Sequence, residues 1–266
     1  MNRIPRSPSK QLETCTHCAA RSKCLIVKLT QQNIGKFPAP FFHSTKLQEG
    51  QYLFRTGDPL SHIYTLKLGA IKSEMVFQDG IRQVTHFSLP GEPIGLDGMA
   101  NGHHQVDAIS LVDSQVCSIS FDSLKKVELE FPALLDGIKN SLGALLNASN
   151  IHIFNLINLT ALEKLADFLI DYSNRLSSVG FDRDNFILPM NRVDLASYLG
   201  IKIETLSRSI TQLEKINAIV IQNRRIKFLS RKPIFEIIDP NILREKHALK
   251  KSETTIYTSA LEKRNQ

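Results

Sequence analysis

The chain has 266 residues, of which 42% are hydrophobic and 22% are charged, an ordinary composition for domains that bury a core of their own. No stretch approaches the roughly 20 consecutive apolar residues of a membrane-spanning helix. The basic N-terminus also lacks the apolar run of a secretory signal. We therefore expect a cytoplasmic protein without membrane contact.

The net charge of +7 is unevenly distributed along the chain. Residues 1–174 contain 16 basic and 16 acidic side chains, whereas residues 175–266 contain 17 basic and 10 acidic ones. A basic region joined to a neutral one is expected of a nucleic-acid binder with a separate sensing part. A basic tail without function would give a similar count, so the charge alone does not decide between them.

Short apolar or alternating segments fill the region from about Phe42 to Phe121, after a polar, cysteine-rich N-terminal stretch. Glycine turns separate these segments. This pattern is typical of a β-barrel or jelly roll and not of a parallel sheet with intervening helices. The expected strands are Gln51–Phe54, Ile63–Leu68, Ile71–Val76, Gln83–Phe87, Ala108–Leu111 and Val116–Ile119.

The apolar spacing becomes helical from about Pro132 to Leu159. Intervals of three, four or seven residues indicate one long helix with a coiled-coil-like seam. The alternative is a buried helix of a monomer core, but this helix is long for that role, so we favour dimerisation. The predicted dimer seam consists of Leu142, Leu146, Ser149, Ile153 and Leu156.

A helix-turn-helix pattern follows a predicted amphipathic helix at Ala161–Leu176. Leu195, Ala196 and Leu199 form the inner face of a short helix, and Gly200 lies where the turn requires a positive φ. The second helix presents outward the residue types that contact base edges. These candidate DNA-binding residues are Lys202, Glu204, Thr205, Ser207 and Arg208.

Two short apolar segments after this pattern, Ala218–Gln222 and Ile226–Leu229, flank Asn223-Arg224-Arg225. They predict a hairpin with a basic tip that contacts phosphate beside the groove. A helix pair with a purely structural role would match the first pattern loosely, but it does not explain the basic hairpin. The sequence therefore predicts a winged helix-turn-helix.

The four cysteines are Cys15, Cys18, Cys24 and Cys117. Three thiolates within ten residues repel one another unless a cation neutralises them, which makes metal binding the natural interpretation. Zinc usually has two paired ligand clusters, whereas here one cluster accompanies a distant thiol, and His17 could supply another ligand. The chemistry favours an iron–sulfur cluster and leaves zinc and redox-active thiols open.

The chain resembles the Fnr proteins, the oxygen-sensing branch of the Crp/Fnr regulators, over roughly residues 12–232. The spacing Cys15-x2-Cys18-x5-Cys24 with a lone Cys117 is similar to the family's 4Fe-4S ligand set. The segments Gly50–Asp58 and Leu89–Gly95 are similar to its sensor barrel. Ile203–Arg208 is similar to its recognition helix, in which Glu, Ser and Arg at this spacing contact bases.

The resemblance implies an α+β fold with an N-terminal double-stranded β-helix, which is a jelly-roll barrel like that of cyclic-nucleotide-binding domains. A long dimerisation helix and a C-terminal winged helix-turn-helix would follow it. The expected divisions are a cysteine segment, the barrel, the dimerisation helix, the DNA-binding domain and a tail, at residues 1–28, 29–131, 132–160, 161–234 and 235–266.

The resemblance also implies the function: a global transcription regulator and activator, not an enzyme. It would sense oxygen through the 4Fe-4S cluster and bind, as an anaerobic homodimer, an inverted repeat resembling TTGAT-N4-ATCAA. RNA polymerase is an expected partner, with the loop Gln78–Ile81 as a candidate contact. The alternative is a regulator of the same fold whose cysteines bind zinc or respond directly to redox conditions.

Two features bear on this interpretation. Cyclic-nucleotide sensors of the fold hold the phosphate with an arginine after the Gly-Glu turn, but no Arg occurs from 83 to 174, which argues against that ligand. Relatives carry acidic residues in the dimer helix, whereas none occurs here between Asp136 and Glu163. We therefore expect a more persistent dimer that depends less on the cluster.

Overall fold

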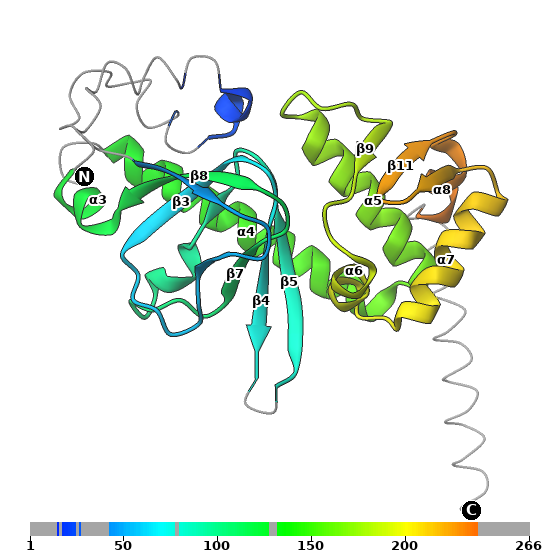
Figure 1. Cartoon of the computed structure of the whole chain (residues 1–266), viewed down its shortest axis with the longest axis horizontal. Helices are drawn as coiled ribbons and strands as arrows, with labels where there is room; N and C mark the ends of the chain where they lie inside the picture. Colours follow the sequence, from blue (N-terminus) through cyan, green and yellow to red (C-terminus); the bar gives the residue numbers. More distant parts are fainter. Residues whose placement is uncertain are drawn as a thin grey trace, which may run out of the picture.

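The computed structural model describes residues 15, 18–24, 27, 43–77, 80–127 and 132–238. His17, the loop residues Gln78 and Asp79, and the tail from Asp239 onward lie outside these ranges, as does most of the segment before His43. Figure 1 shows two bodies joined by long helices: a β-barrel and a smaller helical domain with a short sheet. This confirms the predicted fold class.

The barrel consists of two four-stranded antiparallel sheets, with strand orders β1-β8-β3-β6 and β2-β7-β4-β5. Alternate side chains of the strands face the space between the sheets, where Phe54, Leu66 and Val116 form part of a buried apolar cluster. Every strand expected from the sequence is present, and β1 and β6 are additional ones. The strands are β1 (His43–Leu47), β2 (Tyr52–Phe54), β3 (His62–Leu68), β4 (Ile71–Val76), β5 (Arg82–Ser88), β6 (Pro93–Ile94), β7 (Asp107–Ser110) and β8 (Ser114–Ser120).

Short helical segments accompany the barrel. The first, η1, lies in the N-terminal cysteine-rich stretch and packs against β3 (Figure 1). The last, α3, follows β8 directly and leads towards the long helix α4. The bounds are η1 (Ala19–Ser22), η2 (Leu96–Met99) and α3 (Phe121–Val127).

The predicted long helix is α4 (Pro132–Asn158), and the amphipathic helix is α5 (Ala161–Ser177). Thr160 separates them as the N-cap of α5, where its hydroxyl and the Glu163 side chain form a capping box. Such reciprocal bonds satisfy backbone N–H groups that a helix start leaves unpaired. The boundary between the two helices is therefore encoded locally.

The C-terminal domain contains the predicted helix-turn-helix and wing. Its three-stranded antiparallel sheet has the order β10-β11-β9, and β9 is a strand that the sequence pattern did not reveal. The elements are β9 (Asn185–Ile187), α6 (Arg192–Leu199), α7 (Ile203–Lys215), β10 (Ile219–Gln222), β11 (Arg225–Phe228) and α8 (Lys232–Ile237).

Candidate cysteine centre and DNA-binding surface

Cys117 lies on the outer face of the barrel. On β8 the side chain of Val116 belongs to the interior cluster, whereas Cys117 and Ile119 belong to a second cluster outside it. Successive residues of a strand point to opposite faces, which explains this division. Cys117 pairs across the sheet with Ser44 on β1 and Thr65 on β3, so hydroxyl side chains flank the thiol on both sides.

The N-terminal cysteines reach the same outer face. Cys18 is the N-cap of η1, and Cys24 follows that helix with 7% of its surface exposed. Cys15, Cys24 and Cys117 all pack in the outer apolar cluster. The segment also lies against the barrel turn at Gly91: a Cβ atom added there would lie 2.7 Å from Lys23 Cβ.

The environment of Cys15 and Cys117 opposes the ionisation of their thiols. Burial raises the pKa of Cys117 to about 11, and the neighbouring thiols of Cys24 and Cys15 act in the same direction. Burial and Cys18 likewise raise the pKa of Cys15, against the influence of Lys67. These interactions link all four cysteines, and a bound metal cation would favour their thiolate forms.

The donor set consists of four cysteine side chains, and thiolates can hold either zinc or an iron–sulfur cluster. Within the described ranges, no three His, Cys, Asp or Glu side chains are grouped so that they could hold a metal ion. The buried Thr65 hydroxyl beside Cys117 also has no hydrogen-bond partner in this part of the chain.

The helix-turn-helix has the predicted turn. Asn191 caps α6 by accepting a hydrogen bond from the Asp194 amide at 2.8 Å. Gly200 ends the helix at φ 61° and ψ 40°, a left-handed conformation that glycine adopts without steric cost. Leu206 and Leu213 anchor α7 in the core of the domain, so the opposite face of α7 is available to a ligand.

The predicted DNA-contacting residues lie together on that outward side of α7. Lys202, Glu204 and Arg208 are exposed, and Thr205 and Ser207 are half-buried. The structure adds a residue that the sequence pattern missed, because Arg192 on α6 donates a hydrogen bond to the Ser207 hydroxyl at 3.4 Å. The feature of the sequence that could have indicated Arg192 is a basic residue at the start of the first helix.

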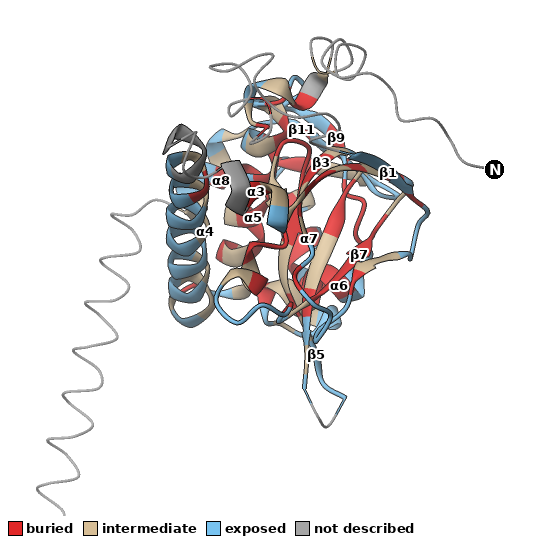
Figure 2. Ribbon diagram, turned by 90° about the vertical axis from the view of Figure 1, so that its left-hand side faces the viewer, coloured by how far each residue is buried: buried red, intermediate tan, exposed pale blue. Residues whose placement is uncertain are grey.

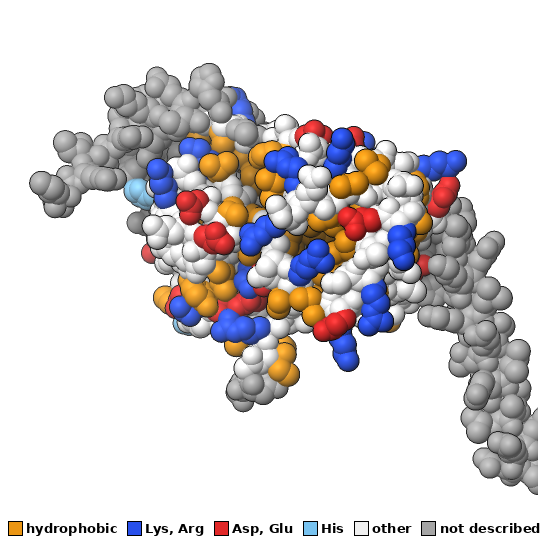
Figure 3. Space-filling view, turned by 45° about the vertical axis from the view of Figure 1, so that its right-hand side comes forward, with side chains coloured by type: hydrophobic (Ala, Val, Ile, Leu, Met, Phe, Trp, Pro, Cys, Tyr) orange, Lys and Arg blue, Asp and Glu red, His pale blue; other side chains and the backbone are white. Residues whose placement is uncertain are grey.

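The wing supplies further basic side chains. Asn223 adopts a left-handed conformation at φ 57°, as a tight turn between β10 and β11 requires. Arg224 and Arg225 are both exposed beside it. Arg224 donates a hydrogen bond to the Pro189 carbonyl at 3.1 Å, and Arg225 donates one to the Asn185 side-chain oxygen at 3.1 Å. Figure 3 brings this side of the molecule forward and shows Lys and Arg side chains over much of its surface.

Comparisons with known proteins agree with these features. Residues 44–128 match the family model of a cyclic nucleotide-binding domain, and residues 163–233 match that of a Crp-like helix-turn-helix domain. The chain is 32% identical over 212 residues to an anaerobic regulatory protein of Pasteurella multocida, covering 80% of this chain and 78% of that relative. The chain belongs to the Crp/Fnr family of transcription regulators.

Other relatives support the predicted Fnr-type membership. The transcriptional activator protein Anr of Pseudomonas protegens is 30% identical over 215 residues, covering 81% of this chain and 88% of that protein. The solved structure of FixK2 from Bradyrhizobium japonicum has a TM-score of 0.69 at 25% identity and covers 74% of this chain and 96% of that one. The family consists of DNA-binding regulators, so the expectation that the chain is not an enzyme is confirmed.

In the part of the chain that the structure describes, no helix could cross a membrane.

The long helix of this Crp/Fnr chain leaves an apolar face uncovered. Leu142, Leu146, Ser149 and Ile153 are exposed, and Figure 2 shows α4 along one side of the molecule with most of its surface open. Leu156, also placed in the predicted dimer seam, is only partly exposed. A Cβ atom added at Gly200 would lie 3.1 Å from the Leu156 side chain, so Leu156 packs towards the helix-turn-helix of its own chain. The neighbouring residues Ile151, Phe154 and Ile157 are exposed apolar side chains that the seam prediction omitted.

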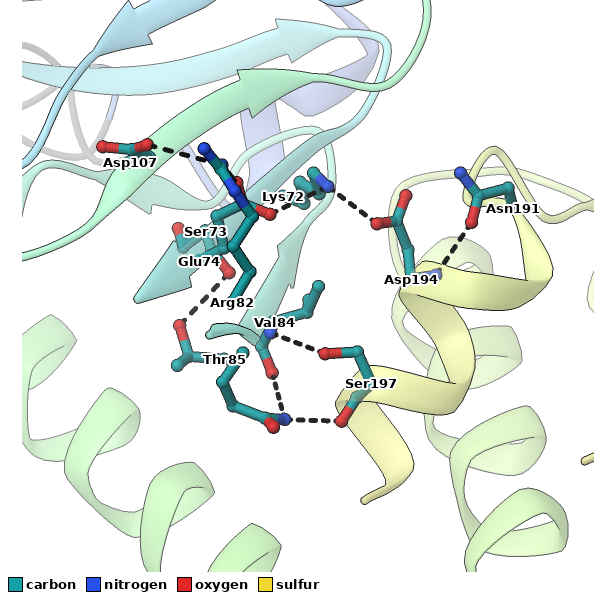
Figure 4. A network of polar contacts seen from close by, with 11 residues as sticks. Lys72, Ser73, Glu74, Arg82, Val84, Thr85, Asp107, Asn191, Asp194 and Ser197 are labelled. Atoms are coloured by element: carbon teal, nitrogen blue, oxygen red, sulfur yellow. Dashed lines mark hydrogen bonds and ion pairs between the residues drawn. The ribbon is translucent and has the colours of Figure 1, made fainter. Parts of the chain in front are cut away.

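The first helix of the helix-turn-helix docks on the barrel. Lys72 of β4 forms ion pairs with Asp194 of α6 at 2.7 Å and with the buried Glu74 at 2.9 Å (Figure 4). The backbone amide of Val84, on the edge strand β5, donates to the Ser197 hydroxyl at 3.0 Å. These contacts fix α6 against the free edge of the sheet.

A second interdomain contact involves the Gly-Glu turn of the barrel. Both carboxylate oxygens of Glu92 accept hydrogen bonds from Arg175 of α5, at 2.9 and 2.6 Å. Although burial opposes it, the Arg175 guanidinium, together with His86, holds the pKa of Glu92 well below its ordinary value of 4.5. The acidic group of this turn is thus engaged by a side chain of the C-terminal region.

Proposed function

We propose that the chain is an oxygen-sensing global transcription regulator with a 4Fe-4S cluster on Cys15, Cys18, Cys24 and Cys117. It binds an inverted-repeat DNA site as a homodimer under anaerobic conditions. The observation that carries the proposal is the convergence of the N-terminal thiols and Cys117, about 90 residues apart in sequence, on one face of the barrel.

When bound, the cluster would supply an oxygen-sensitive link between the N-terminal segment and the barrel. Cys117 provides the rigid side of that link because it lies within a paired strand. Ile138 and Leu145 of α4 pack in the same apolar cluster as Cys24 and Cys117. A change in the packing of the cysteine segment therefore reaches the long helix directly.

For the dimer, we propose pairing through the uncovered face of α4, with the residues named for the seam, Leu142, Leu146, Ser149 and Ile153. Burying this face would remove apolar surface from water. No acidic side chain lies on α4 after Asp136, so we keep the expectation of a more persistent dimer that depends less on the cluster. We also keep the domain divisions at residues 28, 131, 160 and 234 as part of the proposal.

For DNA recognition, we propose that Glu204, Ser207 and Arg208 contact base edges, with Lys202 and Thr205 beside them. Two recognition helices of a dimer would enter successive major grooves about 34 Å apart. The expected site resembles TTGAT-N4-ATCAA, and transcription would be activated through contact with RNA polymerase. The candidate polymerase loop Gln78–Ile81 lies only partly within the described residues.

The test uses full-length protein purified without oxygen. We expect visible absorption, about four irons per chain with matching sulfide, and retardation of duplex DNA that contains the inverted repeat. Admitting air should remove the colour and weaken DNA binding. Cys117→Ser should lack the colour, whereas Ser118→Ala, the neighbouring substitution on the opposite face of β8, should keep it.

Each result has a distinct meaning. A colourless protein that contains zinc, or no metal, but retains specific DNA binding would overturn the iron–sulfur sensor and favour the alternative of zinc or direct thiol redox sensing. A coloured protein without preference for the inverted repeat would overturn the proposed DNA site. Unchanged DNA binding after loss of the colour would contradict oxygen sensing.

A further inference from the structure

Thr65 is a polar residue at a buried position of β3. Its side chain is 2% exposed, and its hydroxyl has no hydrogen-bond partner among the described residues. The neighbours Tyr64 and Leu66 face the barrel interior, so Thr65 points outward with Ile63. The helix η1 packs over this strand and covers it.

The position of Thr65 relates it directly to the cysteine centre. It is the register partner of Cys117 on β8, and directly opposite residues of an antiparallel pair point to the same face. On the other flank of Cys117, its register partner on β1 is Ser44, a second hydroxyl residue. On its other side Thr65 pairs with Pro93, which has no backbone N–H to offer.

A purely structural role does not explain a threonine here. A buried hydroxyl without a partner is unfavourable, and valine has nearly the same shape without that penalty. A neutral thiol is a weak acceptor, whereas a metal-bound thiolate or an inorganic sulfide accepts a hydrogen bond well. Among the described residues, therefore, the hydroxyl of Thr65 has a suitable partner only when a thiolate centre is assembled beside it.

We propose that Thr65 is a positioning residue whose hydroxyl donates a hydrogen bond to a sulfur of the bound centre, either the Cys117 thiolate or a neighbouring sulfide. This inference rests on the iron–sulfur function proposed above. Hydrogen bonds to cluster sulfurs stabilise the more reduced, more negative state and raise the reduction potential. Thr65 would thus slow oxidation of the centre and set the oxygen level at which the regulator responds.

The experiment compares full-length wild type, Thr65→Val, Thr65→Ser and a control, Thr45→Val, prepared without oxygen. Thr45 is an exposed threonine of the same sheet. Iron and sulfide content, reduction potential and the half-life of the visible absorption in air are measured for each. The unfolding stability of the metal-free proteins is measured in parallel.

We expect Thr65→Val to keep its iron, to have a lower potential and to bleach on the order of threefold faster, since one charged hydrogen bond acts on only part of the redox difference. Thr65→Ser should restore both values, and Thr45→Val should match wild type. Metal-free Thr65→Val should be at least as stable as wild type. Loss of iron from Thr65→Val alone would also support the role of the hydroxyl.

Three results would overturn the inference. The first is a Thr65→Val variant whose reduction potential and absorption half-life in air equal those of the wild type. The second is loss of iron from both Thr65→Val and Thr65→Ser. The third is destabilisation of metal-free Thr65→Val, which would indicate a structural hydrogen bond. Absence of iron and sulfide from the wild type is a separate outcome. It would overturn the proposed function itself and the inference with it.

Discussion

The pair formed by Glu92 and Arg175 should couple the barrel to the C-terminal domain energetically. Each side chain is only 18% exposed, and the Arg175 guanidinium also donates a hydrogen bond to the Phe87 carbonyl. The Glu92 carboxylate accepts a third bond, from the Leu89 amide at 3.0 Å. We predict that Glu92→Gln and Arg175→Met each destabilise the protein strongly, because each leaves its buried partner without its main counter-charge. Asp171, 3.3 Å from Arg175, and His86, 3.6 Å from Glu92, replace only part of it.

The magnitude follows from this burial. Removing one member of a buried ion pair costs about 3–5 kcal/mol, whereas removing both members costs much less than twice that amount. The double variant should therefore be less destabilised than the sum of the single variants, by about 2 kcal/mol or more. For a chain of this size, each kcal/mol corresponds to a fall in Tm of roughly 2–4 °C.

The assay is urea unfolding of metal-free protein at pH 7, followed by circular dichroism. The control is Asp136→Asn, which removes an ion pair with Lys139 whose side chains are 70% and 63% exposed and which should change stability by less than about 0.5 kcal/mol. Additive effects in the double variant, or a Glu92→Gln effect no larger than the control, would refute the reasoning.

The pH dependence of the pair has a definite sign. The pKa of Glu92 is lower in the folded protein than its ordinary value of 4.5. The stabilisation from the pair is therefore fully present above about pH 5 and is lost as the pH falls through the depressed folded pKa. The difference between wild type and Glu92→Gln should be undiminished at pH 5 relative to pH 7 and should shrink in more acidic solution.

Three further predictions concern other parts of the molecule. Gly91→Ala should lower the iron content, because the new Cβ would lie 2.7 Å from Lys23 Cβ. The control is Gly102→Ala, which is also at positive φ but in open space and should keep its iron. Equal iron content in the two variants would contradict this prediction. Burial raises the pKa of Asp167 from 3.8 to about 6, so Asp167→Asn should increase the free energy of unfolding at pH 7. This increase should disappear near pH 4, where the carboxyl group of the folded protein is protonated. An increase that does not depend on pH would contradict this prediction. Ile157 is 75% exposed on α4, so Ile157→Asp should shift the sedimentation coefficient towards that of a monomer without lowering the Tm of the monomer. A dimer that is unchanged in this variant would mean that the seam lies elsewhere.

The features predictable from the sequence are those encoded by residues close together in the chain. The glycine turns separate the barrel strands, Gly200 bends the chain between α6 and α7, and the helical period of residues 132–158 is local. The spacing of Cys15, Cys18 and Cys24 likewise indicates metal chemistry without a fold. These signals depend on backbone preferences and side-chain periodicity, which neighbouring residues determine.

The contacts that sequence reasoning missed join residues far apart in the chain. In the sequence, Glu92 belongs to the Gly-Glu turn and Arg175 lies within the predicted helix Ala161–Leu176, and their buried ion pair was not predicted. Leu156 follows the seven-residue seam pattern, but it turns towards Gly200 because the C-terminal end of α4 packs on its own helix-turn-helix. Periodicity identifies an apolar face and does not identify what covers it.

By itself, the sequence determined the kind of protein: a barrel, a long helix, a winged helix-turn-helix and a set of four cysteines with metal-binding spacing. Only the tertiary structure decided which residues surround those cysteines and how the two domains meet. The strand register brings Thr65 beside Cys117, and the docking of α6 on β4 and β5 brings Lys72 to Asp194. Such pairings depend on register and on packing between distant segments, and no local pattern in the chain encodes either of them.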